Sequence, residues 1–446
     1  MGGLLTTDIQ LRAMTKGLTG GTIPLLYGKK EITFNFSKLE VRDILLPFYP
    51  APLDDIVKRI KYSLLFPISS LSFRLHFSPG DKVLILVSDI TRNSGLDIFL
   101  PILIEELNSC GIPDKNIEIL FTLGIHRALK EEEQLAILGK DIGSRIKAYN
   151  HNAWSDETVS PGITSRGNQI FLNRKIFEAD KVVLTGTINF HYLAGFGGGR
   201  KSLLPGAAQY DSIIKFHLLS LYPEPGKGRH PKASAGILTD NPMHEEMEEV
   251  LDMVKPCFLL NTVMDSSKQI VEVFAGDPKE AFMKGCIYFL DHYAVRIRGK
   301  TDIVIASCGG LPYDINFIQA HKSLEYSKNA LKKGGVLVLL AQCSDGIGNN
   351  TFLNWFEHKN VEEFELALRK NFEVNGQTAY STLMKAKEYK IILVSSLPKE
   401  VVEKMSITPA TSIEEAMDIA FSITGSSCSA YVIPQAAKVL PYMVDR

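Results

Sequence analysis

The chain lacks the cysteine patterns that organise small secreted domains and zinc modules. It has six widely spaced cysteines: Cys110, Cys257, Cys286, Cys308, Cys343 and Cys428. Because none of them forms a Cys-x-x-Cys pair, the sequence indicates neither a structural zinc site nor a disulfide framework. We therefore expect a cytoplasmic protein whose thiols stay reduced.

The chain also has no excess of charge of one sign and no long apolar run. Its formal net charge is −1, which gives no electrostatic reason to expect a nucleic-acid partner. No apolar run reaches the roughly 18 residues that span a bilayer, and residues 1–17 lack the basic start and apolar centre of a signal peptide. We expect neither a nucleic-acid partner nor a membrane anchor.

Short apolar runs instead alternate with segments of helical periodicity, which is typical of an α/β fold with mostly parallel sheets. The strand-like runs are residues 83–88, 117–122, 181–187, 303–307, 336–340 and 391–394. The helix-like segments are residues 96–109, 241–254, 278–291, 319–333, 361–370 and 412–422. Asn241 and Ser412 stand where helix N-caps belong.

The chain of 446 residues is long enough for two α/β domains. A helix-like segment ends near residue 295 in the basic stretch RIRGK, and a new strand follows. We therefore expect an N-terminal domain over residues 1–297 and a C-terminal domain over residues 298–446. The strand-like run at 430–434 suits either domain, so the last about 15 residues are candidates for packing on the first.

Reactive side chains follow four of the predicted strands. In open α/β sheets, ligands bind at the carboxyl ends of the strands. The residues at these ends are Asp89 and Arg92, then Gly124 and His126, then His191 with a glycine cluster, then Gly309, Gly310 and Asp314. Polar chemistry is therefore expected at this edge of each sheet.

The segment HYLAGFGGGRKSLLPG, residues 191–206, combines a histidine, a glycine cluster and a lysine. It resembles a phosphate-binding P-loop, but Arg200 occupies the position of the final glycine of that motif. Arg200 argues against nucleotide hydrolysis and leaves two interpretations of the loop. It is either an anion-binding loop of another kind, with Lys201 as a reactive or anion-binding amine, or a tight turn with a surface lysine.

Other candidate residues each have a structural alternative. Asp89 and Arg92 either form a local ion pair or leave Arg92 to bind a carboxylate through its planar guanidinium. Lys322 stands near a helix start, where it opposes the helix dipole, and either binds an anion or is simply solvated. His217 lies in a helical pattern that begins near Asp211, at the edge of the core or directed at the glycine loop. The sequence has no His-Glu-x-x-His motif.

Taken together, these blocks resemble the nickel-dependent lactate racemase family over most of the chain. The resemblance rests on SDITR (88–92), TLGIHR (122–127), HYLAGFGGGRKSLLPG and the later Gln-x-x-Lys helix, which stand in the family's order. It implies two α/β domains with the active site in the cleft between them. It also implies a nickel-pincer nucleotide cofactor, the nickel complex of pyridinium-3,5-bisthiocarboxylic acid mononucleotide.

The resemblance assigns a role to each candidate residue. Lys201 would hold the cofactor covalently through a thioamide, and His217 would be the protein ligand to nickel. His126 and His191 would be the catalytic acid–base pair. Further residues would contact the cofactor, namely Asp89, Gly197, Gly198 and Gly199, or the substrate, namely Arg92, Gln319 and Lys322. Protein made without the cofactor pathway would be apoprotein.

The implied reaction is racemisation or epimerisation of a 2-hydroxy acid by reversible hydride transfer. One histidine takes the hydroxyl proton while hydride leaves, and hydride then returns to the other face of the flat keto acid. The family's lactate-specific members have a tyrosine before the glutamine, where this chain has Ile318, so the substrate is lactate or a larger 2-hydroxy acid. Transient contacts with cofactor-building enzymes are expected. A phosphate-binding transferase that uses Gly195–Ser202 and a non-catalytic organic-acid-binding or nucleotide-binding homologue are the alternatives.

Overall fold

The computed structural model describes residues 21–37, 39–48, 50–89, 94–265, 267–358 and 360–443. The chain divides into two compact units. We call them the central unit (Tyr49–Leu221 and His230–Asp291) and the terminal unit (Met1–Phe48, Tyr222–Arg229 and His292–Arg446). No helix among the described residues is both long and apolar enough to cross a membrane.

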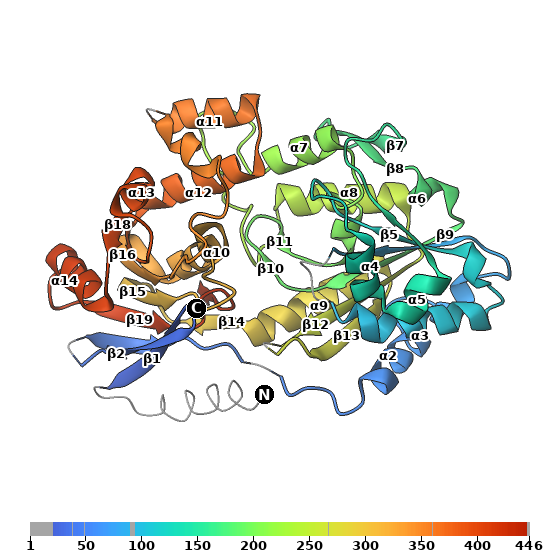
Figure 1. The fold of residues 1–446 in the computed structure, drawn as a ribbon, viewed down its shortest axis with the longest axis horizontal. Coiled ribbons are helices and arrows are strands. Elements are labelled where there is room, and N and C mark those ends of the chain that lie inside the picture. Colours follow the sequence, from blue (N-terminus) through green and yellow to red (C-terminus); the bar gives the residue numbers. More distant parts are fainter. Residues whose placement is uncertain are drawn as a thin grey trace. The chain divides into compact units, whose positions relative to one another are not determined.

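The central unit is built on a six-stranded sheet with the order β13-β12-β9-β4-β5-β6. Figure 1 labels four of these strands, β13, β12, β9 and β5. The strands are β4 (Val83–Val87), β5 (Ile117–Phe121), β6 (Lys147–Asn150), β9 (Lys181–Thr187), β12 (Phe258–Met264) and β13 (Ile270–Gly276). All neighbours pair in parallel except the edge strand β13, which is antiparallel to β12. The carboxyl ends of β9, β4 and β5 therefore lie side by side at one edge of the sheet.

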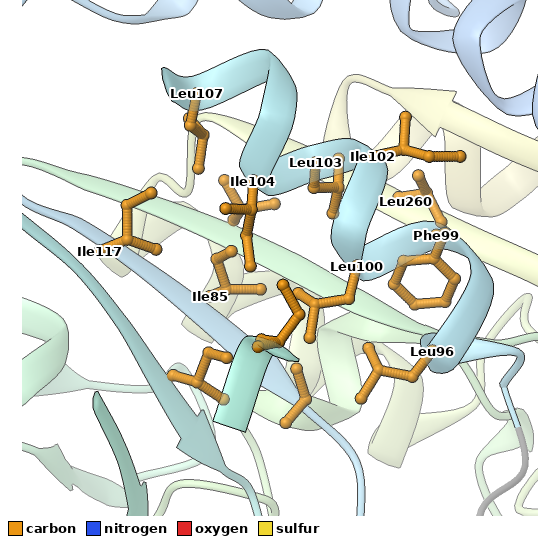
Figure 2. Close-up of a cluster of buried hydrophobic side chains, with 14 of the residues drawn as sticks. Ile85, Leu96, Phe99, Leu100, Ile102, Leu103, Ile104, Leu107, Ile117 and Leu260 are labelled. Carbon is orange, nitrogen blue, oxygen red and sulfur yellow. The ribbon is translucent and has the colours of Figure 1, made fainter. Parts of the chain in front are cut away.

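The core of the central unit explains why its strands are continuous apolar runs. All five residues of β4 are buried, because a parallel sheet in an α/β fold is covered on both faces. Helix α3 (Leu96–Ser109) turns Leu96, Phe99, Leu100, Leu103 and Leu107 toward the sheet at helical spacing (Figure 2).

Further elements complete the central unit. Helices and turns are α2 (Ile56–Leu65), η1 (Phe73–His76), η2 (Asp114–Asn116), α4 (Glu131–Leu138), α5 (Lys140–Arg145), α6 (Lys175–Glu178), η3 (Gly199–Ser202), α7 (Tyr210–Leu218), α8 (Pro242–Val254) and most of α9 (Pro278–Tyr293). Two hairpins pair β7 (Thr158–Ile163) with β8 (Gln169–Asn173) and β10 (Phe190–His191) with β11 (Gly195–Phe196).

The terminal unit has a second six-stranded sheet, in which every neighbour pair is parallel. Its order is β18-β17-β16-β15-β19-β3, with β3 (Glu40–Ile44), β15 (Thr301–Ser307), β16 (Leu331–Leu340), β17 (Lys390–Val394), β18 (Thr408–Ala410) and β19 (Ser429–Ile433). Its helices and turns are α10 (Phe317–Ser327), η4 (Lys328–Ala330), η5 (Phe352–Glu357), α11 (Val361–Lys370), α12 (Val374–Glu388), α13 (Lys399–Lys404) and α14 (Ile413–Thr424). Strand β1 (Thr22–Tyr27) pairs with β2 (Lys30–Asn35), and β14 (Ala294–Ile297) pairs with β20 (Leu440–Met443).

The predicted mixed α/β class and all six predicted strands are confirmed, and the bounds of α3 and α11 match the predicted ones. Both predicted caps are present, because Asn241 accepts from Met243 N and Ser412 accepts from Glu415 N. The predicted helix over 319–333 was wrong at its end. Helix α10 stops at Ser327, since Leu331 already pairs with Thr301 in the parallel sheet.

We predicted a single domain boundary at 297/298, but the two units divide the chain differently. The first 48 residues belong to the terminal unit, because β3 adds to the edge of its sheet beside β19. The segment Tyr222–Arg229 also belongs there, and the two units part at 291/292. The end of the chain stays in the terminal unit as well, since β20 pairs with β14.

Candidate active site

Three of the predicted site residues follow neighbouring parallel strands of the central sheet. Asp89 follows β4, His126 follows β5, and His191 follows β9. Since these three strands are adjacent and point the same way, their exits share one edge of the sheet. The order of the strands in the sheet thus brings to one edge residues that are up to 102 positions apart in sequence, counted from 89 to 191.

His126 and Asp89 form a short polar contact between side chains at this edge. His126 Nδ1 lies 2.5 Å from Asp89 Oδ2. The Asp89 carboxylate is buried, with 7% of its side chain exposed, whereas 57% of the His126 side chain is exposed. A buried carboxylate therefore holds an accessible imidazole by one ring nitrogen, which is how many general bases are oriented.

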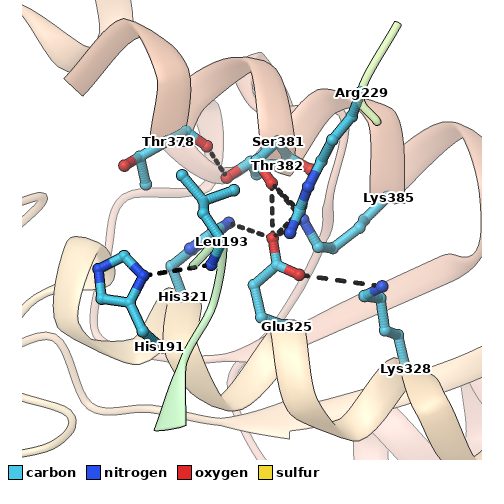
Figure 3. Close-up of polar contacts among 10 residues, drawn as sticks. All are labelled: His191, Leu193, Arg229, His321, Glu325, Lys328, Thr378, Ser381, Thr382 and Lys385. Carbon is cyan, nitrogen blue, oxygen red and sulfur yellow. Dashed lines mark hydrogen bonds and ion pairs between the residues drawn. The ribbon is translucent and has the colours of Figure 1, made fainter. Parts of the chain in front are cut away.

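His191 is held by backbone amides. It lies in the β10–β11 hairpin, and its Nδ1 accepts hydrogen bonds from Ala194 N (3.1 Å) and Leu193 N (3.4 Å); Figure 3 draws the Leu193 contact. Its ring stacks on Tyr192 with 5.4 Å between centroids. The hairpin therefore fixes both the position of the ring and the nitrogen that faces the backbone.

Lys201 lies in the short 3₁₀ turn η3, on a loop that hydrogen bonds to the His126 turn. Gly206 N donates to Lys201 O (2.9 Å), and Gly124 N donates to Gly206 O (2.8 Å). Lys201 is partly exposed, while both of its neighbours, Arg200 and Ser202, are buried. The sequence placed Lys201 and His126 in separate motifs, and the structure joins their loops through the Gly206 backbone.

The glycine cluster has a packing reason of its own. A Cβ at Gly197 would lie 2.5 Å from Asn189 Oδ1, at Gly198 3.0 Å from the Phe282 ring, and at Gly199 3.0 Å from Leu259 Cδ1. Side chains of the protein therefore occupy the space that larger residues would need. Contact of these glycines with a cofactor stays a prediction and would involve their backbone.

His217 lies in the last turn of α7 and is partly buried. The chain between Lys201 and α7 is fixed by backbone bonds from Gln209 N to Phe171 O (2.9 Å) and from Tyr210 N to Ala153 O (2.8 Å). Within the described residues, no group of three or more His, Cys, Asp or Glu side chains is placed to hold a metal ion.

The predicted substrate residues belong to different parts of the chain. Gln319 and Lys322 are exposed on α10 of the terminal unit, where Lys322 Nζ donates to Gln319 Oε1 (3.2 Å). Asn316 caps this helix by accepting from Gln319 N (3.0 Å). Arg92 lies outside the described residues, so its role stays a prediction. Asp314, at the exit of β15, is buried and accepts from Gly28 N (2.6 Å), which gives it a structural role.

A buried charge network on α10 was missed by the sequence analysis. Glu325 is 3% exposed and sits among three cations and a histidine (Figure 3). Its partners are Arg229 Nη1 (2.5 Å), Lys385 Nζ, Lys328 Nζ (3.9 Å) and His321 Nε2 (3.7 Å).

The pKa values of this network follow from its burial and its ion pairs. Burial lowers the pKa of Lys385 to about 7 and that of His321 to about 3. Burial alone would raise the pKa of Glu325, but Arg229 and Lys385 hold it well below its usual range. Only the three-residue and four-residue spacings of His321, Glu325 and Lys328 on one helix could have hinted at this cluster.

Known proteins match this chain in sequence over most of its length. The Lactate racemase N-terminal domain family matches residues 27–228, and the Lactate racemase C-terminal domain family matches residues 297–440. A lactate racemase of Thermoanaerobacterium thermosaccharolyticum is 32% identical over 94% of this chain and 98% of its own length. A lactate racemase of Lactiplantibacillus plantarum is 32% identical over 85% of this chain and 90% of its own length.

Solved structures agree with these matches. The lactate racemase apoprotein of Thermoanaerobacterium thermosaccharolyticum superposes with a TM-score of 0.86 at 30% identity and covers 95% of this chain and 100% of that one. A crystal structure of a Thermotoga maritima protein reaches a TM-score of 0.62 at 19% identity over 89% of this chain, which shows likeness of fold alone. The predicted resemblance is thereby confirmed, and the chain belongs to the nickel-dependent lactate racemase family.

Proposed function

We propose that this chain interconverts the two configurations of a 2-hydroxy acid at its sheet edge, with lactate as the first candidate substrate. Lactate comes first because two relatives with this name match nearly the whole chain. The observation that carries the proposal is the way in which the backbone and Asp89 hold the two histidines. It supports one imidazole nitrogen that accepts a hydrogen bond and one that donates a hydrogen bond at this edge of the sheet.

The hydrogen bonds of each ring define its tautomer. An ionised carboxylate only accepts hydrogen bonds, so His126 Nδ1, 2.5 Å from Asp89, carries a proton and leaves its Nε2 as the acceptor. A backbone amide only donates, so His191 Nδ1 carries no proton and its neutral ring has the proton on Nε2. With one proton on each ring, His126 presents an acceptor at Nε2 and His191 presents a donor at the same ring atom.

This complementarity suits a racemase. His126 Nε2 accepts the hydroxyl proton of one enantiomer, while His191 donates a proton to the oxygen of the keto acid when its ring is protonated as an imidazolium, which leaves it neutral. Each cycle leaves the pair with its roles exchanged, so the reverse reaction uses the same two side chains. Asp89 stabilises the imidazolium that His126 becomes after it takes the proton.

The residues of the central unit fit the nickel-pincer nucleotide. Lys201, a partly exposed residue, supplies a primary amine for covalent attachment, and His217 supplies an imidazole, which suits nickel. The absence of a three-residue metal cluster among the described residues fits a metal whose remaining ligands come from the organic group. When bound, this cofactor supplies an acceptor for the substrate's hydride.

The remaining predicted residues have roles in holding the substrate and the cofactor. Arg92 and Lys322 oppose the negative charge of the carboxylate, and Gln319 borders the substrate and orients Lys322 through their 3.2 Å hydrogen bond. Ile318 presents a hydrocarbon wall where lactate-specific relatives have a tyrosine. Substrates with a larger apolar group than the methyl of lactate are therefore the second candidates.

The transferase alternative gains no support from the loop geometry. Arg200, at the final glycine position of a P-loop, is buried rather than directed at a ligand, and η3 has only four residues. A transferase of this kind would need tight binding of a nucleoside triphosphate with magnesium. A non-catalytic homologue would bind the acid and leave its configuration unchanged.

A stereochemical screen tests the proposal. Protein produced together with the cofactor-building enzymes is incubated with single enantiomers of lactate and of larger 2-hydroxy acids, and chiral chromatography follows the ratio of enantiomers. We expect approach to a 1:1 mixture for at least one acid, a nucleotide-sized mass increase that K201A abolishes, and bound nickel. Loaded, nickel-containing protein that leaves every acid in its original configuration contradicts the proposal.

A further inference from the structure

Arg200 stands directly before Lys201, and its side chain is wholly buried, with 0% exposed. Its guanidinium carbon lies 3.8 Å from the centre of the Phe282 ring on α9. Its Nη1 is 3.5 Å from Met247 Sδ and its Nε is 3.6 Å from Glu248 Oε1, both on α8. The arginine thus extends from the Lys201 loop into the space between two helices.

This burial is costly for folding. Arg200 Nε and Nη2 have no hydrogen-bond partner among the described residues, nor has Glu248 Oε1. Burial lowers the pKa of Arg200 to about 10 and raises that of Glu248, as expected for charged groups removed from water. Well-packed apolar residues of similar volume often replace a buried ion pair without loss of stability. Folding alone therefore gives no reason for a charged pair here.

The geometry of the Gly199–Ser202 turn gives a reason for the charged pair. A 3₁₀ turn has three residues per turn, so consecutive side chains point about 120° apart. Arg200 points toward α8 and α9, and Ser202 Oγ donates to Thr185 O (3.2 Å) on β9. The third direction belongs to Lys201, which is partly exposed. Gly199 N, bonded to Asn261 Oδ1 at 2.8 Å, fixes the start of the turn.

We propose that Arg200 is a positioning residue for Lys201. Stacked on Phe282 and paired with Glu248, its guanidinium fixes the rotation of the Gly199–Ser202 turn and with it the direction in which the Lys201 amine extends. The proposal rests on the proposed function, in which this amine receives the cofactor. It also explains the arginine that separates this loop from a P-loop, because the position serves as an internal anchor.

The reactivity of the Lys201 amine in apoprotein tests this role without the cofactor. The probe is the acetyl ester of N-hydroxysuccinimide at limiting concentration, and peptide mass spectrometry gives the acetylation rate of Lys201 relative to the exposed Lys130 and Lys227. The main variant is R200M/E248Q, which removes the buried Arg200 charge and the partly buried Glu248 charge together. We expect its Lys201 rate to fall about tenfold while the rates at Lys130 and Lys227 and the stability to urea stay unchanged.

Two further variants complete the experiment. R369M/E365Q removes a comparable buried pair in the terminal unit, 2.6 Å between Nη2 and Oε1, and should leave the Lys201 rate unchanged. R200K keeps the charge but loses the planar group that stacks on Phe282, so it should also lower the Lys201 rate. If R200M/E248Q folds and its Lys201 is acetylated at the wild-type rate, the proposal is overturned. If R200M/E248Q does not fold, a folded R200K protein with the wild-type Lys201 rate overturns the proposal instead.

Cofactor loading distinguishes a failure of the proposed function from a failure of the positioning role of Arg200. If wild-type protein made with the cofactor pathway carries no adduct at Lys201, the proposed function fails whatever the labelling shows. If the wild type loads fully and R200M/E248Q loads as fast, the positioning role fails alone. We expect the wild type to load and the double variant to show a lower adduct fraction by intact mass.

Discussion

His126 Nδ1 lies 2.5 Å from Asp89 Oδ2, and this contact joins the exits of two neighbouring strands across 37 positions of sequence. It occupies Nδ1 of His126 and leaves Nε2 as the ring nitrogen that Asp89 does not hold. The sequence suggested Arg92 as the partner of Asp89 because both stand in one short motif. The structure gives Asp89 a second task, the orientation of the His126 ring, in addition to the predicted contact with the cofactor.

Replacing Asp89 with asparagine should lower turnover more than substrate binding. The amide of D89N neither fixes the proton on His126 Nδ1 nor stabilises the imidazolium. We expect kcat of loaded enzyme to fall by about 10²-fold or more, with KM and the Lys201 adduct little changed. D141N, which alters an exposed carboxylate that pairs with Arg145, serves as the control. A kcat equal to that of D141N would remove Asp89 from the mechanism.

The two histidines should be equally necessary. H126A and H191A each remove one of the two proton-transfer groups, so each should abolish racemisation in both directions. Intact mass should still show the Lys201 adduct, because neither side chain attaches the cofactor. Full activity of either variant in loaded form would exclude the two-histidine mechanism.

His217 should affect metal retention rather than attachment. H217A removes the proposed protein ligand, so loaded protein should keep its Lys201 adduct but lose nickel during dialysis against a chelator. Elemental analysis of the dialysed protein measures this directly, with H151A as the control, since His151 is buried and bonded to Ala208 O (2.9 Å). Nickel content equal to that of the wild type would exclude the ligand role.

Lys385 should make stability depend on pH near neutrality. Burial lowers its folded pKa to about 7 from 10.5, so between these values the unfolded chain binds more protons than the folded one. Stability therefore rises with pH above about 7, by up to about 1.4 kcal/mol per pH unit from this group. Urea unfolding at pH 6.5 and 8.5 should show that the difference in unfolding free energy between wild type and K385M increases with pH. A difference that is constant or falls would contradict this.

The sequence predicted the local structure and part of the site. Apolar runs such as Val83–Val87 reveal buried parallel strands, and helical spacing gives α3 its bounds, because these signals are contained in a few neighbouring residues. The exits of β4, β5 and β9 could be recognised for the same reason.

Non-local pairing could not be predicted in this way. Strand β3 joins a sheet whose other strands lie about 260 or more residues later, counted from Glu40 to Thr301, and its sequence EVRDI has no long apolar run. The Asp89–His126 contact and the Glu325 network likewise join segments through the fold, and only the spacing on α10 within the latter is local.

The most direct test follows the α-hydrogen of the substrate. Loaded enzyme in ordinary water is given a single enantiomer of its substrate with deuterium at the α-carbon, and both enantiomers are analysed by mass spectrometry near equilibrium. In our account the histidines handle only the hydroxyl proton and the α-hydrogen moves as hydride, so both enantiomers should retain deuterium. Loss of the label to solvent in step with racemisation would show that a histidine removes the α-proton, and would contradict the account.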